Sequence, residues 1–298
     1  MVPIELLAVA APFCIALGGM FSAELRGRLT VVGITAWRTL VPIPFLLLLA
    51  TVGGGWQSIE LQYLPYLMLS GVIGMVIADM SFSASIFVIG ARLATLVFSL
   101  NAPVAAVLAY LVLGEPVSAG KAAGIGMVLA GVALAVLFRP GDAGRAQSEP
   151  ALTRRQLTQG ILLGVCSAIA QATSVLVARP VMAQGLDGAA AMSVRLLAAA
   201  AVLAVIVPFL PRRSALPPLT PKLVRYSALG ALIGVGVGVT MVFTALQRGD
   251  VATVVTLASL TPVAVLPLVW IRSRRAPAWQ AWAGAFVAFA GAALIANS

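Results

Sequence analysis

Long apolar stretches alternate with short polar segments along the whole chain. Each stretch approaches the roughly 20 residues that cross a bilayer as a helix, and none shows the alternating polarity of a barrel strand. The ten stretches lie at about 3–21, 31–51, 63–87, 93–113, 119–138, 157–178, 188–210, 223–246, 251–271 and 278–297. This pattern predicts an all-α polytopic membrane protein with ten transmembrane helices.

The chain also repeats itself. Residues 90–106 read GARLATLVFSLNAPVAA and residues 249–265 read GDVATVVTLASLTPVAV, with Pro103 and Pro262 in register. Five apolar stretches fall in each half, and an odd number means that the second half enters the membrane from the opposite face. The sequence therefore predicts two inverted five-helix repeats, an arrangement on which many secondary transporters are built.

A polar segment rich in glycine, proline and arginine separates the two halves. It predicts a solvated loop between the fifth and sixth helices. The expected organisation is repeat 1 at 1–138, a linker at 139–155 and repeat 2 at 156–298.

Composition and charge support a membrane protein and indicate its orientation. Hydrophobic residues make up 61% and charged residues 9% of the chain, whereas soluble domains carry roughly 25% charged residues. The net charge of +10 does not indicate nucleic acid, because fourteen of the nineteen basic residues lie in loops on one side and three on the other. The positive-inside rule then predicts both termini outside the cytoplasm. The expected location is a bacterial-type inner (plasma) membrane.

The sequence offers little for catalysis or for a cofactor. It has no histidine and no GxxxxGK[ST] motif, and Asp79 is the one acidic residue deep in an apolar stretch. An aspartyl mechanism needs two carboxylates, and a serine nucleophile needs a base. We therefore expect no cofactor, no metal and no enzyme; an intramembrane enzyme is the weakest alternative.

Several short motifs recur between the halves. They are Arg38, the Pro103 stretch that ends in Leu113-Gly114-Glu115-Pro116 and the Gly/Ala-rich fifth stretch, matched by Arg195, the Pro262 stretch and the stretch from Gly284. With these residues the chain resembles the drug/metabolite transporter superfamily, in particular ten-helix proteins with two EamA-type repeats.

That resemblance implies export of small metabolites, with amino acids a prominent class and the aromatic amino acid exporters a neighbouring branch. The chain departs from the family pattern in two ways. Arg274-Arg275-Ala276-Pro277 stands where the family often repeats its Gly-Glu pair. Such proteins are also usually drawn with both termini in the cytoplasm, opposite to the charge count.

Asp79 is the first candidate site residue. A carboxylate within a transmembrane helix costs about 2.5–3.5 kcal/mol and usually faces the bundle interior or a wet cavity. It could bind a substrate amino group or take up a proton as the coupling ion; alternatively, it pairs structurally with Arg38 or Arg195. Phe82 and Ser83 follow at i+3 and i+4 and therefore share its helix face.

Neutral polar residues form further candidates, in the fourth, sixth and eighth stretches. They are Asn101, Gln171 with Ser174, and Thr240 with Thr244. Amides and hydroxyls suit a zwitterionic or polar neutral ligand, although hydroxyls in membrane helices also bond their own i−4 carbonyl or a neighbouring helix.

Arg38 and Arg195 occupy similar depths in the second and seventh stretches. They could contact a substrate anion, or they could snorkel to the interface or bond helix carbonyls, and we favour the structural role. The expected partners are the lipid bilayer and a small metabolite such as an amino acid. A sugar-phosphate or nucleotide-sugar carrier is the alternative, but it would need several deep cations that converge on one phosphate.

Overall fold

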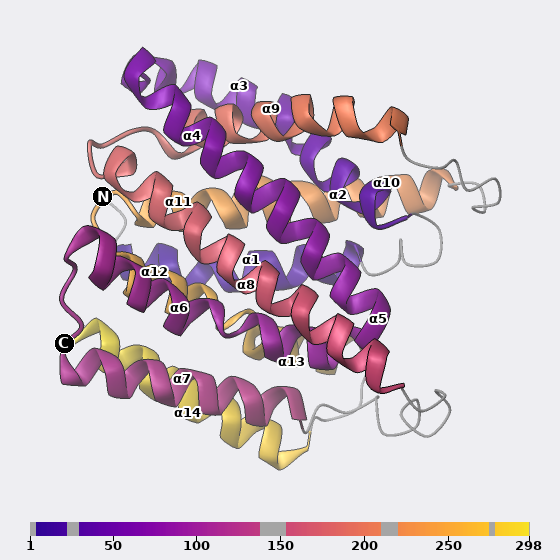
Figure 1. The fold of residues 1–298 in the computed structure, drawn as a ribbon, viewed down its shortest axis with the longest axis vertical. Coiled ribbons are helices and arrows are strands. Elements are labelled where there is room, and N and C mark those ends of the chain that lie inside the picture. Colours follow the sequence, from indigo (N-terminus) through magenta and orange to yellow (C-terminus); the bar gives the residue numbers. More distant parts are fainter. Residues whose placement is uncertain (1–3, 23–29, 138–152, 210–219, 274–277, 298) are drawn as a thin grey trace.

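The structure is a computed structural model that describes residues 4–22, 30–137, 153–209, 220–273 and 278–297. Within these ranges the regular structure is entirely helical, as Figure 1 shows. Eight helical segments are long and apolar enough to cross a membrane, and two shorter apolar helices, Ala10–Phe21 and Trp279–Ile295, complete the set. This confirms the prediction of a polytopic all-α membrane protein.

The first half contains four short helical segments of 3₁₀ or π type besides its α-helices. The α-helices are α1 (Ile4–Ser22), α2 (Val31–Leu40), α3 (Pro42–Val52), α4 (Leu64–Gly71), α5 (Asp79–Phe98), α6 (Asn101–Leu108) and α7 (Ala119–Leu137). The 3₁₀ segments are η2 (Gly55–Ser58) and η3 (Leu61–Tyr63), and the π segments are η4 (Val72–Ala78) and η5 (Ala109–Leu113).

The second half follows a similar plan. Its α-helices are α8 (Arg154–Met182), α9 (Gly188–Ile206), α10 (Pro221–Ala231), α11 (Thr240–Ala245), α12 (Val251–Ala258), α13 (Thr261–Ser273) and α14 (Trp279–Ala296). One 3₁₀ segment, η6 (Val207–Phe209), and one π segment, η7 (Leu232–Val239), accompany them.

The two halves share irregularities that the hydropathy pattern does not reveal. A π segment lies in the third span of each half, η4 in the first and η7 in the second. The fourth span of each half is broken, at Ser99–Leu100 between α5 and α6 and at Ser259–Leu260 between α12 and α13. Pro103 and Pro262 follow these breaks within the first turn of the next helix, where a missing N–H costs no ladder hydrogen bond.

Gly90 reverses the chain between the third and fourth spans. Its φ of 77° and ψ of 160° interrupt α5. Glycine adopts this positive-φ conformation without the strain that a side chain would bring. Residues before and after Gly90 therefore lie on neighbouring antiparallel spans, although α5 carries them both.

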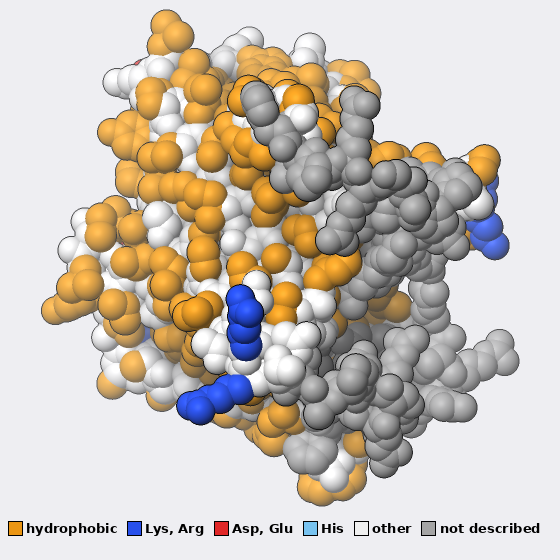
Figure 2. Space-filling model, turned by 45° about the vertical axis from the view of Figure 1, so that its right-hand side comes forward, with side chains coloured by type: hydrophobic (Ala, Val, Ile, Leu, Met, Phe, Trp, Pro, Cys, Tyr) orange, Lys and Arg blue, Asp and Glu red, His pale blue; other side chains and the backbone are white. Residues whose placement is uncertain are grey.

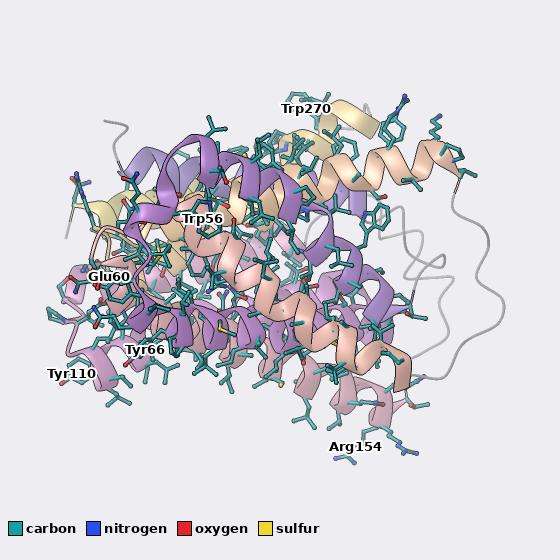
Figure 3. The ribbon with its side chains drawn as sticks, turned by 90° about the horizontal axis from the view of Figure 1, so that it is seen from above. Trp56, Glu60, Tyr66, Tyr110, Arg154 and Trp270 are labelled. Atoms are coloured by element: carbon teal, nitrogen blue, oxygen red, sulfur yellow. The ribbon has the colours of Figure 1, made fainter. Side chains whose placement is uncertain are left out.

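The molecule has two different ends along the direction of its helices (Figure 1). At one end α1 begins and α14 ends, beside the turns Gly53–Glu60, Gly114–Ser118, Ala183–Asp187 and Leu246–Asp250; we call this end the short-loop face. At the other end, the basic face, α8 and α10 begin with Arg154, Arg155, Lys222 and Arg225. Figure 3 shows Glu60 and Tyr110 on the side opposite to Arg154.

The last residues of the predicted linker, at the start of α8, lie on the basic face. Residues 139–152 fall outside the described residues, and α8 begins at Arg154, inside the last part of the predicted segment. Thr153 caps this helix: its Oγ1 accepts a hydrogen bond from the amide of Gln156, whose side chain in turn bonds the amide of Thr153. This capping box fixes the entry into the second half.

Hydrophobic side chains cover the outside of the molecule as well as its interior. Figure 2 shows a largely apolar surface interrupted by few basic side chains. Leu48, Leu111 and Phe286 are among the most exposed, at 64%, 70% and 76%. A soluble domain would not leave so much contiguous apolar surface in water, whereas the hydrocarbon of a bilayer accepts it.

Candidate substrate site

Asp79 lies at the junction of η4 and α5, inside the third span. Its Oδ1 forms an ion pair of 2.7 Å with Nη1 of Arg38, and its Oδ2 accepts a hydrogen bond of 3.0 Å from Oγ1 of Thr35. Thr35 and Arg38 are three residues apart on α2, so they share one face of that helix. Of the two arginines considered from the sequence, the structure therefore brings Arg38 to Asp79.

The pair is neutralised but incompletely covered. The Arg38 side chain is 26% exposed and the Asp79 side chain 11% exposed. Opposite charges in contact reduce the cost of holding each one within an apolar span. Because part of each group stays uncovered, a small solute with charges of both signs could exchange with this pair.

An aromatic residue, Phe82, follows the carboxylate by one helical turn. Phe82 follows Asp79 on α5, and its ring centroid is 4.7 Å from that of Phe98. Since Gly90 reverses the chain midway between them, this contact joins the third span to the fourth. Ser83 shares this region, is 6% exposed and forms no hydrogen bond to another described residue.

Asn101 begins α6 directly after the break in the fourth span and is 5% exposed. Its Oδ1 accepts a hydrogen bond of 2.9 Å from Oγ of Ser259, which stands at the equivalent break in the ninth span. The broken spans of the two repeats therefore meet at this pair. Gly90 lies midway in sequence between Asp79 and Asn101, which places these residues at similar depths on adjacent spans.

Arg195 is 1% exposed and makes no ion pair with a described residue. Its Nη1 donates to Oγ of Ser70, its Nη2 lies 3.3 Å from Oγ of Ser174, and its guanidinium carbon lies 3.7 Å from the centroid of the Phe243 ring. Ser70 and Ser174 also donate to each other's carbonyl oxygens, at 2.6 and 2.8 Å. Ser174 therefore belongs to a structural cluster around Arg195, apart from Asp79.

The remaining predicted contacts separate into two groups. The hydroxyls of Thr240 and Thr244 donate to the carbonyls four residues earlier, of Gly236 and Thr240, at 2.7 and 2.9 Å. These are the local bonds that compete with ligand binding. Gln171 is half-buried and forms no hydrogen bond to a described residue. Of these three side chains, only the Gln171 amide is left without a described partner.

Three partners in this region were not predicted from the sequence: Thr35, Phe98 and Ser259. The third has a partial signal, since Ser259 aligns with Leu100, the residue directly before Asn101, in the repeated segments. Thr35 could be found only as the residue three positions before Arg38 on the same helix face. Phe98 gives no sign of its role, because an aromatic residue in an apolar span is ordinary.

No alternative site stands out among the described residues. Among the described residues no three His, Cys, Asp or Glu side chains come together as a metal site would require. A shallow hollow lies along the first turns of α8, between Arg154 and Leu163, far from Asp79 in the sequence and on the basic face. The Asp79 region therefore remains the best candidate for solute binding.

Comparisons with known proteins agree with this architecture. A solved structure, described only as the crystal structure of a protein, is similar over 98% of this chain and 94% of its own, with a TM-score of 0.75 and 17% sequence identity. That likeness concerns the fold alone. No curated protein sequence matches the chain.

The family comparison is more specific. The model of the EamA-like transporter family matches residues 2–137 and again residues 158–297, so that nearly the whole chain is covered by two copies. Each match corresponds to one five-span half. The chain belongs to the EamA-like transporter family, within the drug/metabolite transporter superfamily, and is a membrane transporter of small molecules.

Proposed function

We propose that this protein exports small zwitterionic metabolites, most of all amino acids, by alternating access across a bacterial-type inner membrane. The observation that carries the proposal is the partly exposed Arg38–Asp79 ion pair inside the membrane. A zwitterion supplies an ammonium group for Asp79 and a carboxylate for Arg38. It can therefore replace the ion pair without leaving either charge unpaired, which would be costly in an apolar span.

The surroundings favour a solute with an apolar part. Phe82 follows Asp79 by one helical turn in the third span, and its ring packs against that of Phe98 in the fourth. Such rings provide apolar contact area with little conformational freedom to lose. Amino acids with large apolar or aromatic side chains fit this combination, in keeping with the aromatic amino acid exporters among the family's branches.

A sugar-phosphate or nucleotide-sugar carrier is the second candidate, and the charges argue against it. Arg38 is already neutralised by Asp79, and Arg195 is enclosed by Ser70, Ser174 and Phe243. A phosphate dianion would need two or more cations free to converge on it. Catalysis would need a second carboxylate beside Asp79 or a base beside a serine nucleophile, so the site favours transport over catalysis.

The basic face is proposed to be cytoplasmic. Arg154, Arg155, Lys222 and Arg225 gather there, whereas Glu60, Glu115, Asp187 and Asp250 all lie on the short-loop face. This distribution follows the positive-inside rule. Export then carries the solute from the basic face to the short-loop face, and a proton taken up by Asp79 could drive the return.

The test is ligand-induced stabilisation combined with transport. The purified protein is heated with each amino acid at millimolar concentration, since a ligand that binds the folded state raises the melting temperature. We expect apolar amino acids to stabilise the native protein and to be transported out of vesicles that contain it. D79N should lose both the stabilisation and the transport. D187N is the matched control, because Asp187 caps α9 on the short-loop face and forms no ion pair with a described residue.

D79N leaves Arg38 without its partner and could reduce folding. The double variant R38Q/D79N removes both charges and serves as the second test, with the same loss of amino-acid stabilisation expected. The proposal is wrong if no amino acid stabilises the native protein, or if the folded double variant responds as the native chain does. An unchanged pH response of efflux in D79N would remove Asp79 as the proton-coupling group.

A further inference from the structure

Four charged residues connect the two repeats on the short-loop face. Nζ of Lys121 lies 2.9 Å from Oδ2 of Asp250, and Nε of Arg179 lies 3.3 Å from Oε1 of Glu115. Lys121 and Glu115 belong to the first half, Asp250 and Arg179 to the second. We call these four residues the cross-repeat brace. Each pair crosses from one repeat to the other, so the brace ties the repeats together at this face.

Both pairs act on the first turn of α12. Asp250 caps this helix by accepting the amide of Thr253 at 2.8 Å, and its other oxygen binds Lys121. Oε2 of Glu115 accepts the amide of Val251 at 2.9 Å. Two carboxylates thus satisfy amides at a helix N-terminus, where the helix dipole also favours negative charge. Through these bonds the start of α12 is fixed to the end of η5 and the start of α7.

The other end of α12 is a break in the chain. The helix stops at Ala258, and Ser259–Leu260 separate it from α13. At this break Ser259 bonds Asn101, which stands at the matching break of the first repeat. The short helix α12 is therefore held by the cross-repeat brace at its outer end. Its inner end is the chain break at Ser259–Leu260, near the depth of the proposed substrate site.

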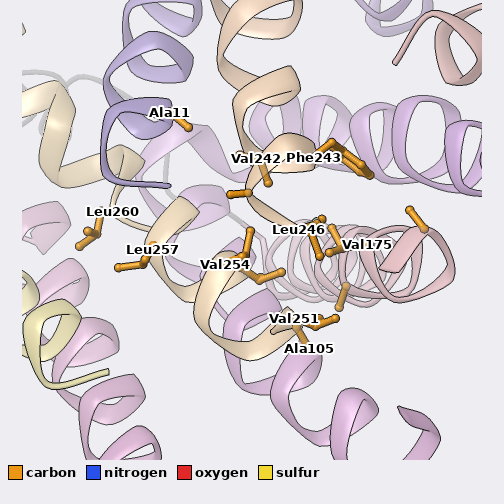
Figure 4. Close-up of a cluster of buried hydrophobic side chains, with 14 of the residues drawn as sticks. Ala11, Ala105, Val175, Val242, Phe243, Leu246, Val251, Val254, Leu257 and Leu260 are labelled. Atoms are coloured by element: carbon orange, nitrogen blue, oxygen red, sulfur yellow. The ribbon is translucent and has the colours of Figure 1, made fainter. Parts of the chain in front are cut away.

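The inner face of α12 covers the interior beneath the short-loop face. Val251 and Val254 are 0% and 1% exposed. Figure 4 shows them in the cluster with Ala105, Val175 and Leu246, which come from spans of both repeats. While α12 stays in place, no solute can pass between the repeats along these side chains.

We propose that the cross-repeat brace is the closed gate of the short-loop face, and that α12 is the element that swings at Ser259–Leu260 when this face opens. The inference rests on the proposed function, because a gate has meaning only for alternating access. It assigns to Glu115, Lys121, Arg179 and Asp250 a role outside the substrate site.

The brace is one-sided, which argues against a purely architectural role. In the repeated segments Ala91 stands where the second half has Asp250, so the first-half copy of α12 begins without an acidic cap. A contact needed to build each five-span repeat would be expected in both copies. Among the described residues the ion pairs that join the two repeats all lie on the short-loop face, so the brace makes the two faces open with different ease.

Proton uptake does not release this gate under ordinary conditions. Burial raises the pKa of Asp250, but the hydrogen bonds from Thr253 and from Lys121 lower it further, and the pKa lies below its ordinary value of 3.8. Asp250 therefore stays ionised at neutral and mildly acidic pH. The gate must be released by the rearrangement that accompanies solute binding or return.

A thiol reporter beneath the gate tests the proposal without any substrate. The two native cysteines, Cys14 and Cys166, are replaced, and Val254 is changed to Cys in sealed vesicles. A membrane-impermeant maleimide is then applied from the short-loop side. We expect K121M and D250N each to speed labelling by about fivefold, the population shift that follows from losing one partly buried ion pair.

The choice of D250N and two control variants make the result specific. D250N keeps an N-cap for α12, because asparagine also accepts the Thr253 amide. D187N changes an equivalent cap on α9 without breaking an ion pair and should leave labelling unchanged. K121R keeps the charge and should label as the native protein does. A second reporter at Ala252, which is 3% exposed, replaces Val254→Cys if that variant folds poorly.

The gate proposal is wrong if K121M and D250N label at the native rate, or if D187N speeds labelling as much as they do. No amino acid enters this experiment. If labelling is unchanged but amino acids still stabilise the protein, the gate proposal alone is wrong. If labelling is faster but no amino acid stabilises the protein, the proposed substrate class alone is wrong.

Discussion

Arg38 and Arg195 occupy similar places in the two repeats and meet different surroundings. Arg38 pairs with Asp79, whereas the aligned position in the second half, Gly238, offers Arg195 no acid. Arg195 instead contacts Ser70, Ser174 and the face of Phe243, and its Nε has no acceptor among the described residues. Neutral groups hold the guanidinium in place, but they do not offset the cost of removing its charge from water as a carboxylate would.

We therefore predict that R195M folds and keeps amino-acid stabilisation, with a melting temperature at or above the native one. Methionine fills a similar volume without a buried charge, and Ser70 and Ser174 still donate to each other's carbonyls. The measurement is thermal unfolding in detergent, with and without ligand. A folded R195M protein that no longer responds to ligand would instead place Arg195 in the substrate site.

At the scale of elements, α7 and α14 pack backbone to backbone. A Cβ added at Gly284 would lie 2.6 Å from the carbonyl oxygen of Gly131, and one added at Gly291 would lie 2.8 Å from that of Gly124. Gly124 and Gly131 are seven residues apart on α7, as are Gly284 and Gly291 on α14, so each pair faces one side of its helix. Small residues at such positions let membrane helices approach closely, which increases their van der Waals contact.

We predict that G284A lowers the free energy of unfolding by about 1–3 kcal/mol, because the obstructing atoms are backbone and cannot turn aside. G126A on the same helix pair is the matched control, since its added Cβ would meet nothing within 4 Å. That change should be neutral or slightly stabilising. Thermal unfolding of both variants provides the measurement; equal losses would show that the close approach is not responsible.

At the scale of the whole molecule, the two faces differ in charge. The short-loop face carries four acidic residues, two of them paired with Lys121 and Arg179, and the basic starts of α8 and α10 lie at the opposite end (Figure 1). Tyr66 and Tyr110 accompany the short-loop face and Trp270 the basic face, as aromatic residues do at membrane interfaces. The basic face is therefore the one expected on the cytoplasmic side.

We predict that a fluorescent protein fused to the C-terminus stays dark in bacterial cells, if it matures only in the cytoplasm. The same protein inserted into the loop 139–152, between the halves, should fluoresce, because the basic face is cytoplasmic. The insertion serves as the control for expression. Fluorescence from the C-terminal fusion would show that the short-loop face is cytoplasmic. The proposed orientation, and the side on which the gate opens, would then be wrong.

Much of the architecture could be predicted because it depends on local properties of the chain. A span needs about 20 apolar residues in sequence, and the parity of five spans per half inverts the second repeat. The repeated Pro103 and Pro262 segments likewise marked corresponding spans. The breaks at Ser99–Leu100 and Ser259–Leu260 were not predicted, because hydropathy is insensitive to a one-residue change in helical hydrogen bonding.

The candidate site stays a prediction, whose central residue the sequence singles out and whose neighbours it indicates only in part. Asp79 stood out because a charge deep in an apolar span is rare. Phe82 and Ser83 followed from helical spacing, but Ser174 joined Arg195, and Thr240 and Thr244 bonded their own helix. Serine and threonine have a local alternative for every distant partner, so their spacing alone does not decide which one they take.

The sequence by itself determined the membrane class, the helical repeats and the one deep carboxylate, since each is set by composition and spacing along the chain. Tertiary structure decided which arginine meets Asp79 and which charges join Lys121 and Glu115. Those pairings connect residues 41, 64 and 129 positions apart, and they depend on how helices from different spans cross. Only packing in three dimensions specifies such crossings, because each apolar span presents several faces that could serve equally well.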